Sequence, residues 1–385
     1  MVNTSNFKGA ITRDVLQKVI VVQAAASTPL LAMLLGNNRI LDAKSQKVEW
    51  YTTEAGSRRT QINNGPDDYD ENTTSIVVDD GTVALPNDQI IFEATGEIGI
   101  VTAVSGNTWT VIRGIGSVSA AGGSVADDEY IMNIGNASGE GADAPADSEA
   151  SKTAEHNWLQ TFRRSIQVSG RQNRIETLTE DELAFQRAQA FELINHDQEH
   201  AMLFGARNGN AGNDADGNKI TTMGGLREMV TTNVSNINGT MSQTEFDAFA
   251  ESAFDSGSTE KDLYAGSKLI QAITDLHRDQ RRITEPVANV GLRVVNIETP
   301  FGKLRLHHHP LFRGAFNGDG IVADVNDLKL RPTAKNGGGR LQLKKDTQDK
   351  GKDATREEYF AEHTLDFGAE QKHAQIRGVT GADLT

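Results

Sequence analysis

The clearest hydrophobic pattern in the chain lies between residues 157 and 205. Its first part alternates apolar and polar residues with a period of two, as in a strand with one buried face. The apolar positions of this alternation are Trp158, Phe162, Ile166 and Val168. Ser169-Gly170 interrupts the alternation. The pattern therefore predicts one extended strand followed by a turn.

A long helix is predicted after this turn, from Thr179 to about residue 204. Glu182 follows Thr179 by three residues, which is the spacing of a capping box, and Gly205 can end the helix. Between these ends, apolar residues recur at helical spacing at Leu183, Ala190, Phe191, Ile194, Ala201 and Met202. A helix of this length measures roughly 39 Å at 1.5 Å per residue. It exceeds what a compact enzyme domain usually needs and suits a structural spar.

Short strands separated by turn residues are predicted between residues 61 and 150. Ile98–Val104 and Thr108–Arg113 flank Ser105-Gly106-Asn107, which is a hairpin signal. Further short strands are expected at Ile76–Val78, Gln89–Phe92 and Tyr130–Ile134. This arrangement predicts a small β-barrel or sandwich, followed by a linker at residues 135–151. The flanking stretches VEWYTTEAGSRR and HNWLQTFRRSI also read as strands, and they are able to pair as two legs of one long hairpin.

Charge separates the same segment from the rest of the chain. Residues 61–150 hold sixteen acidic residues and one basic residue, Arg113, so this segment alone carries the net charge of −15. The remaining residues are balanced, with 37 acidic and 37 basic side chains. An acidic surface repels nucleic acid. We therefore expect this acidic module to face away from any DNA that the protein meets.

The composition excludes several classes of protein. The chain has 385 residues and no cysteine, which excludes disulfides, thiolate metal sites and cysteine nucleophiles. No signal peptide is recognisable at the N-terminus, and Val15–Leu35 contains too many polar residues for a membrane span. We expect instead a helix to Ala26, a break at Pro29 and an apolar arm to Leu35. The protein is expected to have no membrane partner.

The second half of the chain predicts a mixed α/β structure. The turn-rich residues after Arg207, up to Thr222, are expected to form a loop. Helices and strands are then expected in the order Thr244–Phe254, Ser267–Arg278, Leu292–Ile297, Lys303–His308, Tyr359–Phe367 and Ala374–Val379.

Two groups of histidines are the candidate metal ligands. His196 and His200 lie four residues apart on the long helix, but Asp197 stands where a zinc protease needs glutamate. We expect this part of the helix to be a solvated face with charge pairs. In the run His307-His308-His309, alternation places His308 opposite its two neighbours, so we expect a surface strand end. No phosphate-binding loop, GxSxG elbow or basic stripe with interleaved aromatic residues occurs in the sequence.

The order of these elements resembles the major capsid protein of tailed bacteriophages, which has the Hong Kong 97-type fold. The resemblance covers most of the chain and depends on the order of several short stretches. These are STPLLAMLLG, KVEWYTTE, NWLQTFRRSIQVSGRQNR, AMLFG, GGLREM, ETPFGKLRLHHHPLF, DLKLRPT and AEHTLDFGAEQKHAQIRGV. It implies an α+β fold whose parts are an N-terminal arm (1–47), an extended β-hairpin loop (48–165), a peripheral domain with a spine helix at about 179–204 (166–220), an axial domain (221–350) and a return to the peripheral domain (351–385). The sequence departs from the simplest family pattern in having a small all-β domain, at about 61–150, inserted in the extended loop.

The resemblance implies a structural protein that is not an enzyme and needs no cofactor. Such a protein self-assembles as pentamers and hexamers into an icosahedral shell that encloses double-stranded DNA. Scaffolding, portal and decoration proteins are its expected partners, its inner face contacts DNA without sequence preference, and it belongs to a virion capsid assembled in the host cytoplasm. Two alternatives remain: a surface or tail adhesin that displays the acidic β-module, and a metal-dependent hydrolase using His196 and His200.

A shell requires contacts between neighbouring subunits. The candidate intersubunit contacts are Leu30, Leu31, Leu34, Leu35, Arg58, Arg59, Arg163 and Arg164. We expect the leucines to pack on the body of the protein or on a neighbouring subunit. The arginines, on the two legs of the predicted hairpin, are expected to meet acidic residues of an adjacent subunit.

Overall fold

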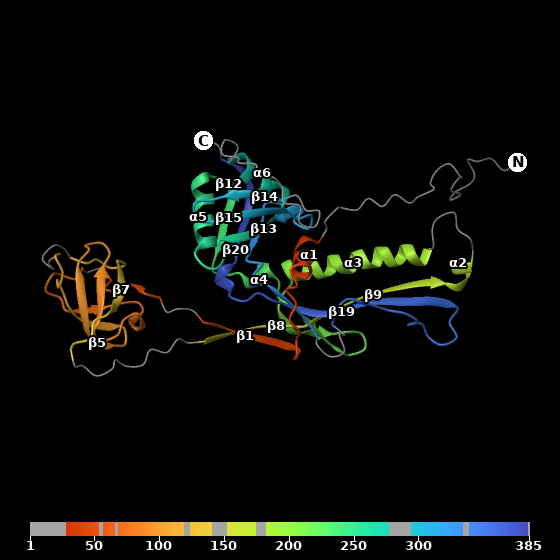
Figure 1. The fold of residues 1–385 in the computed structure, drawn as a ribbon, viewed down its shortest axis with the longest axis horizontal. Coiled ribbons are helices and arrows are strands. Elements are labelled where there is room, and N and C mark those ends of the chain that lie inside the picture. The colour runs from red at the N-terminus through yellow and green to blue at the C-terminus, as the bar shows by residue number, and fades with distance from the viewer. Residues whose placement is uncertain are drawn as a thin grey trace. The chain divides into compact units, whose positions relative to one another are not determined.

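The computed structural model describes residues 28–53, 57–65, 68–118, 124–140, 152–174, 182–276, 294–333 and 339–383. The chain divides into two compact units. The body consists of Met1–Trp50 and Ala154–Thr385, and the small unit consists of Tyr51–Thr153. Figure 1 shows both. No helix of the described residues is long and apolar enough to cross a membrane.

Two long antiparallel strands and one long helix form the first half of the body. Strand β9 (Gln160–Ser169) pairs along its whole length with β19 (Ala354–Asp366), which also pairs with β17 (Lys329–Pro332) and β18 (Gln342–Lys344). Helix α3 (Glu182–Phe204) packs against β9 and β19 (Figure 1). On β9 the buried side chains alternate at Phe162, Ile166 and Val168, which confirms the predicted strand and its buried face over this stretch. The prediction is wrong at Trp158, which is the partly buried last residue of a separate strand, β8 (Lys152–Trp158).

The ends of strand β9 and helix α3 lie where the local sequence predicted them. Strand β9 ends at Ser169, and the short helix α2 (Gly170–Arg174) begins at the predicted break. Helix α3 ends at Phe204, where the Gly205 amide donates to the carbonyl of Ala201 at 3.0 Å. The predicted helix start at Thr179 and its capping box lie outside the described residues. The 23 described residues of α3 span about 34 Å, which agrees with the long structural helix that the sequence predicts.

A six-stranded mixed sheet forms the second half of the body. Its strands, in spatial order, are β12 (Val234–Met241), β20 (Ala374–Ala382), β16 (Gly320–Ala323), β13 (Glu260–Ala265), β15 (Lys303–His308) and β14 (Val294–Glu298). Helices α5 (Gln243–Phe254) and α6 (Ser267–Leu276) bury Phe246, Phe249, Leu269 and Ile273 in the same core as this sheet. A capping box between Ser242 and Glu245 begins α5. The helices and strands predicted here are confirmed within the described residues.

The strand order differs from the expected division of the chain at residue 350. Strands β17 and β18 precede this boundary, but they pair with β19 in the sheet of β9. Strand β20 follows the boundary, but it lies inside the six-stranded sheet between β12 and β16. The chain therefore passes between the two sheets more than once, and the reason is pairing between strands far apart in sequence.

The predicted loop after Arg207 is wrong in part, because it contains a β-hairpin. Strands β10 (Asn208–Asn213) and β11 (Lys219–Thr222) pair in antiparallel fashion. The carboxylate of Asp214 accepts the amides of Asp216 and Asn218, and Gly217 takes a φ of 83°. Asp favours turns because its carboxylate can accept nearby backbone amides, and Gly favours them because it tolerates a positive φ. The remaining short elements are α1 (Pro29–Gly36), α4 (Leu226–Met229) and the 3-10 helices η2 (Gly81–Val83), η4 (Gly314–Phe316) and η6 (Glu370–Lys372).

The small unit is a closed β-barrel, the first of the two predicted alternatives. Its strands follow the order β2 (Arg59–Gln61), β7 (Tyr130–Asn136), β4 (Asp88–Phe92), β5 (Ile98–Ser105), β6 (Thr108–Ile112) and β3 (Ser75–Val77). The two edges meet through an Ile62–Val78 bridge, where Asn63 N donates to Val77 O and Asp79 N to Gln61 O, each at 2.9 Å. The flanking strands β1 (Lys47–Thr53) and β8 (Lys152–Trp158) pair, which confirms the expected legs in part. The expectation is wrong for the arginines, because Arg59 lies on β2 of the barrel and Arg163 and Arg164 lie on β9, which pairs with β19. Closure removes the exposed strand edges.

A buried ion pair lies beside the apolar core of the barrel. Trp109 is fully buried in that core and donates its ring N–H to the carbonyl of Gly81. The Arg113 guanidinium donates to both carboxylate oxygens of Glu97, at 2.9 and 2.6 Å, and both side chains are buried. The Gly114 amide donates to the same carboxylate at 3.0 Å. The single basic residue of the acidic segment therefore neutralises a carboxylate that water does not reach.

Replacing Arg113 by leucine is expected to destabilise the barrel by about 3–5 kcal/mol, because Glu97 would remain buried without its counter-charge. The measurement is hydrogen exchange of the β5 and β6 amides, which reports on the barrel separately from the body. Arg59→Gln is the matched control, because that arginine pairs with Glu93 while its side chain is half exposed. Equal protection in Arg113→Leu and Arg59→Gln would contradict this prediction.

Candidate functional site

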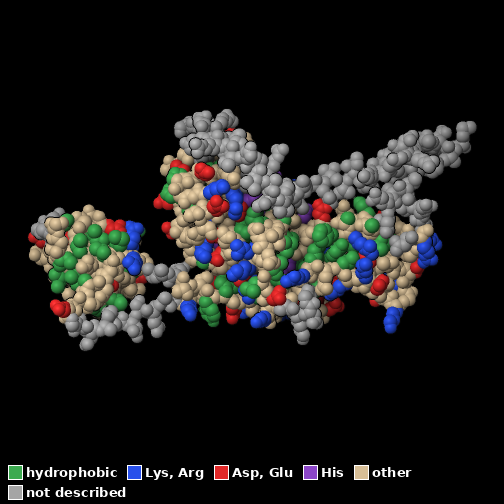
Figure 2. All heavy atoms as spheres, viewed as in Figure 1, with side chains coloured by type: hydrophobic (Ala, Val, Ile, Leu, Met, Phe, Trp, Pro, Cys, Tyr) green, Lys and Arg blue, Asp and Glu red, His purple; other side chains and the backbone are tan. Residues whose placement is uncertain are grey.

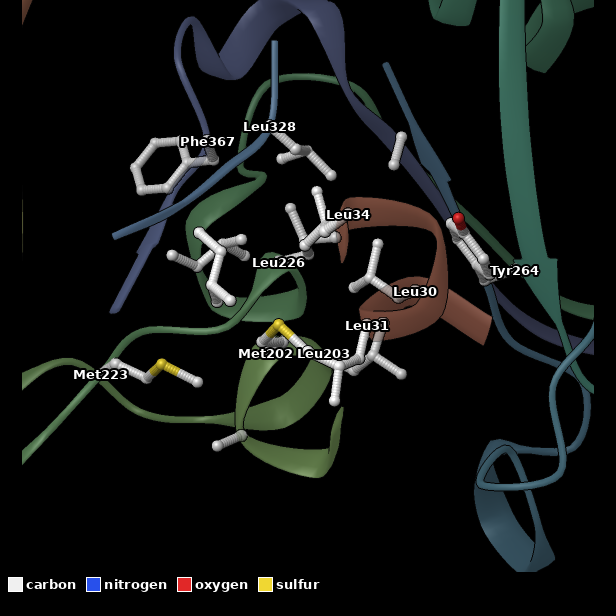
Figure 3. Packing of buried hydrophobic residues seen from close by; sticks show 14 of the residues in the cluster. Leu30, Leu31, Leu34, Met202, Leu203, Met223, Leu226, Tyr264, Leu328 and Phe367 are labelled. Atoms are coloured by element: carbon white, nitrogen blue, oxygen red, sulfur yellow. The ribbon is translucent and has the colours of Figure 1, made fainter. Parts of the chain in front are cut away.

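The predicted apolar arm forms helix α1 and packs into the core of the body. Leu30, Leu31 and Leu34 are buried, and Figure 3 shows them directed toward Met202, Leu203 and Leu226. Leu35, next to Leu34 in the last turn of α1, is 50% exposed. The candidate leucines therefore divide into three that hold α1 on its own chain and one that remains available to a neighbour.

A fully buried carboxylate on α3 holds the N-terminus of α1. Glu199 accepts the backbone amides of Leu30 and Leu31, one on each carboxylate oxygen, both at 2.8 Å. Thr28, the local N-cap residue, makes no capping hydrogen bond with its side chain. Unpaired amides and the helix dipole favour an anion at this position. A side chain 168 residues further along the chain from Leu31 therefore supplies the cap.

The same carboxylate also bonds to the segment that follows β15. His309 places its Nε2 atom 2.8 Å from Glu199 Oε1, and both side chains are fully buried. The other ring nitrogen of His309 accepts the Leu311 amide at 3.2 Å, so Nε2 is the nitrogen that carries the proton and donates to Glu199. Glu199 thus receives three hydrogen bonds, from α1 and from the histidine run. Helices α1 and α3 and the chain after β15 meet at this one side chain.

A second buried carboxylate lies on the adjacent strand β13. Asp262 accepts Arg305 Nε at 2.8 Å and Nη2 at 2.6 Å, and His307 Nε2 lies 2.7 Å from its Oδ1 atom. The ring of His307 stacks on Tyr264, and the Tyr264 hydroxyl donates to the sulfur of Met33 at 3.2 Å. Burial raises the pKa of Tyr264 well above its usual value, so this hydroxyl keeps its proton. These contacts connect the six-stranded sheet to α1.

The two histidine groups have structural roles that the sequence did not predict. His308 is exposed and its two neighbours are buried, which confirms the alternation, but the expected surface strand end is wrong for His307 and His309. Each of the two buried rings bonds to a carboxylate. Between His196 and His200 the expected solvated face is wrong at Glu199, which is buried beneath α1. Within the described residues, no group of three or more His, Asp and Glu side chains is placed to hold a metal ion.

Three of the four candidate arginines bond to acidic residues of their own chain. Arg59 donates to Glu93 and lies 4.4 Å from the ring centroid of Tyr130. In the body, Arg163 donates to Glu358 and Arg164 donates to Asp197. The hydrogen bond from Arg163 lowers the pKa of Glu358. Arg58 is exposed, and its side chain has no ionic partner among the described residues.

The position of Glu199 in the sequence of the helix indicates that its side chain is buried. It precedes Met202 and Leu203 by three and four residues, so it lies on the buried stripe of the helix. An acidic residue at such a position must find donors, because burying an unpaired charge is costly. The stripe therefore indicates that Glu199 has partners, but their identity depends on α1 and the residues after β15.

Glu199→Ala is expected to release α1, because two buried amides and the ring N–H of His309 would lose their acceptor. The expected destabilisation is about 3 kcal/mol or more, since each buried donor left unpaired costs about 1–3 kcal/mol. Hydrogen exchange of residues 30–36 measures the release, with urea unfolding as the second readout. Asp197→Ala, two residues away on the exposed face, is the control and should leave α1 protected. Undiminished protection of α1 in Glu199→Ala would show that the carboxylate is dispensable.

The chain matches the family described as SU10 major capsid protein over residues 3–380. No curated protein matches it. This family is one of structural capsid proteins, which places the chain in the capsid of a virion and confirms the resemblance to tailed-phage capsid proteins.

The solved structures to which this chain is similar share very little sequence with it. The capsid of native GTA particle is 7% identical, covers 98% of each chain and has a TM-score of 0.51. A chain of the cyanophage A-1(L) capsid asymmetric unit is 11% identical, covers 94% of this chain and 95% of its own, and also has a TM-score of 0.51. A chain of Mycobacterium phage Bobi is 9% identical over 97% and 96% of the two chains, with a TM-score of 0.47. The expected Hong Kong 97-type capsid fold is confirmed. The chain belongs to the SU10 major capsid protein family.

Proposed function

We propose that this capsid protein self-assembles as pentamers and hexamers into an icosahedral shell around double-stranded DNA. The observation that carries the proposal is the family match over residues 3–380, which leaves almost none of the chain outside the capsid family. The protein acts structurally and catalyses no reaction. Its expected partners are copies of itself together with scaffolding, portal and decoration proteins.

Exposed side chains of the body and of the small unit supply candidate contacts between subunits. Leu35 and Arg58 are the strongest of the eight candidates, because Leu35 is half exposed and exposed Arg58 has no ionic partner among the described residues. Arg163 remains 65% exposed although it pairs with Glu358, so a neighbouring carboxylate can approach it. Leu30, Leu31 and Leu34 act indirectly in this proposal, because they fix the position from which Leu35 is presented.

The charge distribution supports an orientation of the acidic barrel away from packaged DNA. Residues 61–150 carry a net charge of −15, and a polyanion at close range would repel them. The charge-balanced body is better suited to the inner face of a shell. A density map of the shell with the barrel in its lumen would contradict this orientation.

Expression of the chain, followed by negative-stain electron microscopy, tests the assembly proposal. Shells, tubes or flat hexamer sheets are the expected products, formed by the chain alone or with its candidate scaffolding protein. Small closed oligomers that persist in both preparations would overturn the shell proposal and favour the adhesin alternative.

Leu35→Asp is expected to reduce the yield of shells while leaving the free energy of unfolding nearly unchanged, because the side chain is half exposed in the single chain. Leu34→Ala is the matched comparison one residue earlier. It should destabilise the chain itself by about 2–5 kcal/mol, as expected for a leucine removed from a core. Particle counts by electron microscopy and urea unfolding separate the two effects. An equal shell yield from Leu35→Asp and unmodified protein would exclude Leu35 from the subunit contacts.

A further inference from the structure

Two arginines of the body, Arg227 on α4 and Arg377 on β20, lie beside a single carboxylate. Arg227 donates from Nη1 to Asp319 Oδ2 at 2.8 Å. The other oxygen of Asp319 accepts the backbone amide of Gly378 at 2.9 Å, so both oxygens of this buried carboxylate already have a partner. Among the described residues, no other carboxylate bonds to either arginine. Two positive charges are therefore balanced by one negative charge.

Arg377 is held in place by neutral groups. Its Nε and Nη2 atoms donate to the side-chain oxygen of Gln375 at 3.0 and 2.8 Å, and Nη2 also donates to the Arg227 carbonyl at 3.3 Å. Gln375 is itself buried and donates to the carbonyl of Val230. Burial and the neighbouring charge of Arg227 lower the pKa of Arg377. Arginine nevertheless stays charged in proteins, so the site holds a cation without a counter-ion.

The two guanidinium groups keep donors that can bind a ligand from outside the chain. Nη1 of Arg377 and Nη2 of Arg227 have no hydrogen-bond partner within the part of the chain that the structure describes. The Arg227 side chain is 28% exposed, and its guanidinium carbon lies 4.6 Å from the ring centroid of Phe316. A cation–π contact of this kind favours one position of the guanidinium. Both arginines are therefore positioned before any ligand arrives.

Many arginines of the body pair with carboxylates of their own chain. On the face of the body that Figure 2 shows, acidic and basic side chains are interspersed. Arg163, Arg187 and Arg331 each bond to a glutamate or an aspartate. Arg377 differs from these three, because it is fixed by a buried glutamine and a carbonyl while a second arginine repels it. An anion from outside the chain would balance the charge at this point.

We propose that Arg227 and Arg377 together bind a phosphate group. Guanidinium groups bind phosphate through pairs of parallel hydrogen bonds. A tetrahedral phosphate has acceptor oxygens on more than one side, so two arginines can bind it at once, whereas one arginine matches a planar carboxylate. A phosphodiester also carries the single negative charge that the site lacks. Free phosphate and the backbone of nucleic acid are the two sources, and the second source rests on the proposed function, in which the shell encloses DNA.

Modification of arginines by phenylglyoxal tests the site on the unassembled chain. Mass spectrometry measures how fast each arginine reacts in inorganic phosphate and in sodium chloride of the same ionic strength. Phosphate is expected to slow the reaction of Arg227 and Arg377 about fivefold or more. Arg340 is the internal control, because its side chain is 63% exposed and lies 3.9 Å from Asp42, and its rate should not change. Equal rates at Arg377 in the two salts overturn the proposal.

A variant measures the affinity of the same site. Arg377→Gln is expected to weaken the binding of radiolabelled inorganic phosphate in equilibrium dialysis about tenfold or more. Arg340→Gln is the matched control, because it removes the same charge and should bind phosphate as tightly as the unmodified chain. Equal affinity of Arg377→Gln and the unmodified chain refutes the site. If Arg377→Gln does not fold, the reaction rates of the unmodified chain decide the result.

The same modification of assembled particles, in buffer without phosphate, distinguishes the sources. Slow reaction at Arg377 in DNA-filled shells and fast reaction in empty shells support packaged DNA as the source. Fast reaction in both, with protection of the unassembled chain by phosphate, supports free phosphate. Slow reaction already in empty shells overturns the proposal, because a neighbouring protein copy would occupy the site. Samples without shells refute the proposed function alone, because the phosphate measurements use the unassembled chain.

Discussion

The arrangement of the body depends on one buried carboxylate, that of Glu199. It accepts two amides at the start of α1 and the ring N–H of His309, so three segments distant in sequence converge on it. A buried charge is stable only while its donors are in place, and buried donors are equally costly without an acceptor. The three segments are therefore coupled, and α1 docks on the spine helix at one position. That position decides which leucines are buried and that Leu35 is presented outside.

Buried carboxylates have the same role elsewhere in the protein. Asp262 joins β13 to two side chains of β15, and Glu97 joins the β4–β5 turn of the barrel to Arg113. The chain has no cysteine, so no disulfide fixes these contacts. Hydrogen-bonded ionic contacts are directional, and a fully satisfied buried network specifies which segments meet. In a protein that must be built identically many times, we regard this specificity as more important than the modest net stability of each pair.

The body and the barrel use their charge differently. Ion pairs with both partners in the same chain occupy the body, whose acidic and basic residues are balanced. The barrel carries an excess of acid, and the exposed apolar side chains of β7 lie beside the Arg59–Glu93 ion pair.

The sequence by itself determined the local elements: the β9 alternation, the end of α3 at Gly205, the barrel hairpin and helices α5 and α6. Periodicity, turn residues and caps act over a few residues, so they are readable without the fold. The order of residues also carried the family resemblance. Only the tertiary structure decided that Glu199 caps α1, that His307 and His309 are buried, and that β20 lies apart from β19. These outcomes depend on partners 45 to 169 residues away for the two histidines and α1, and no local pattern specifies which distant donor a buried acid will meet.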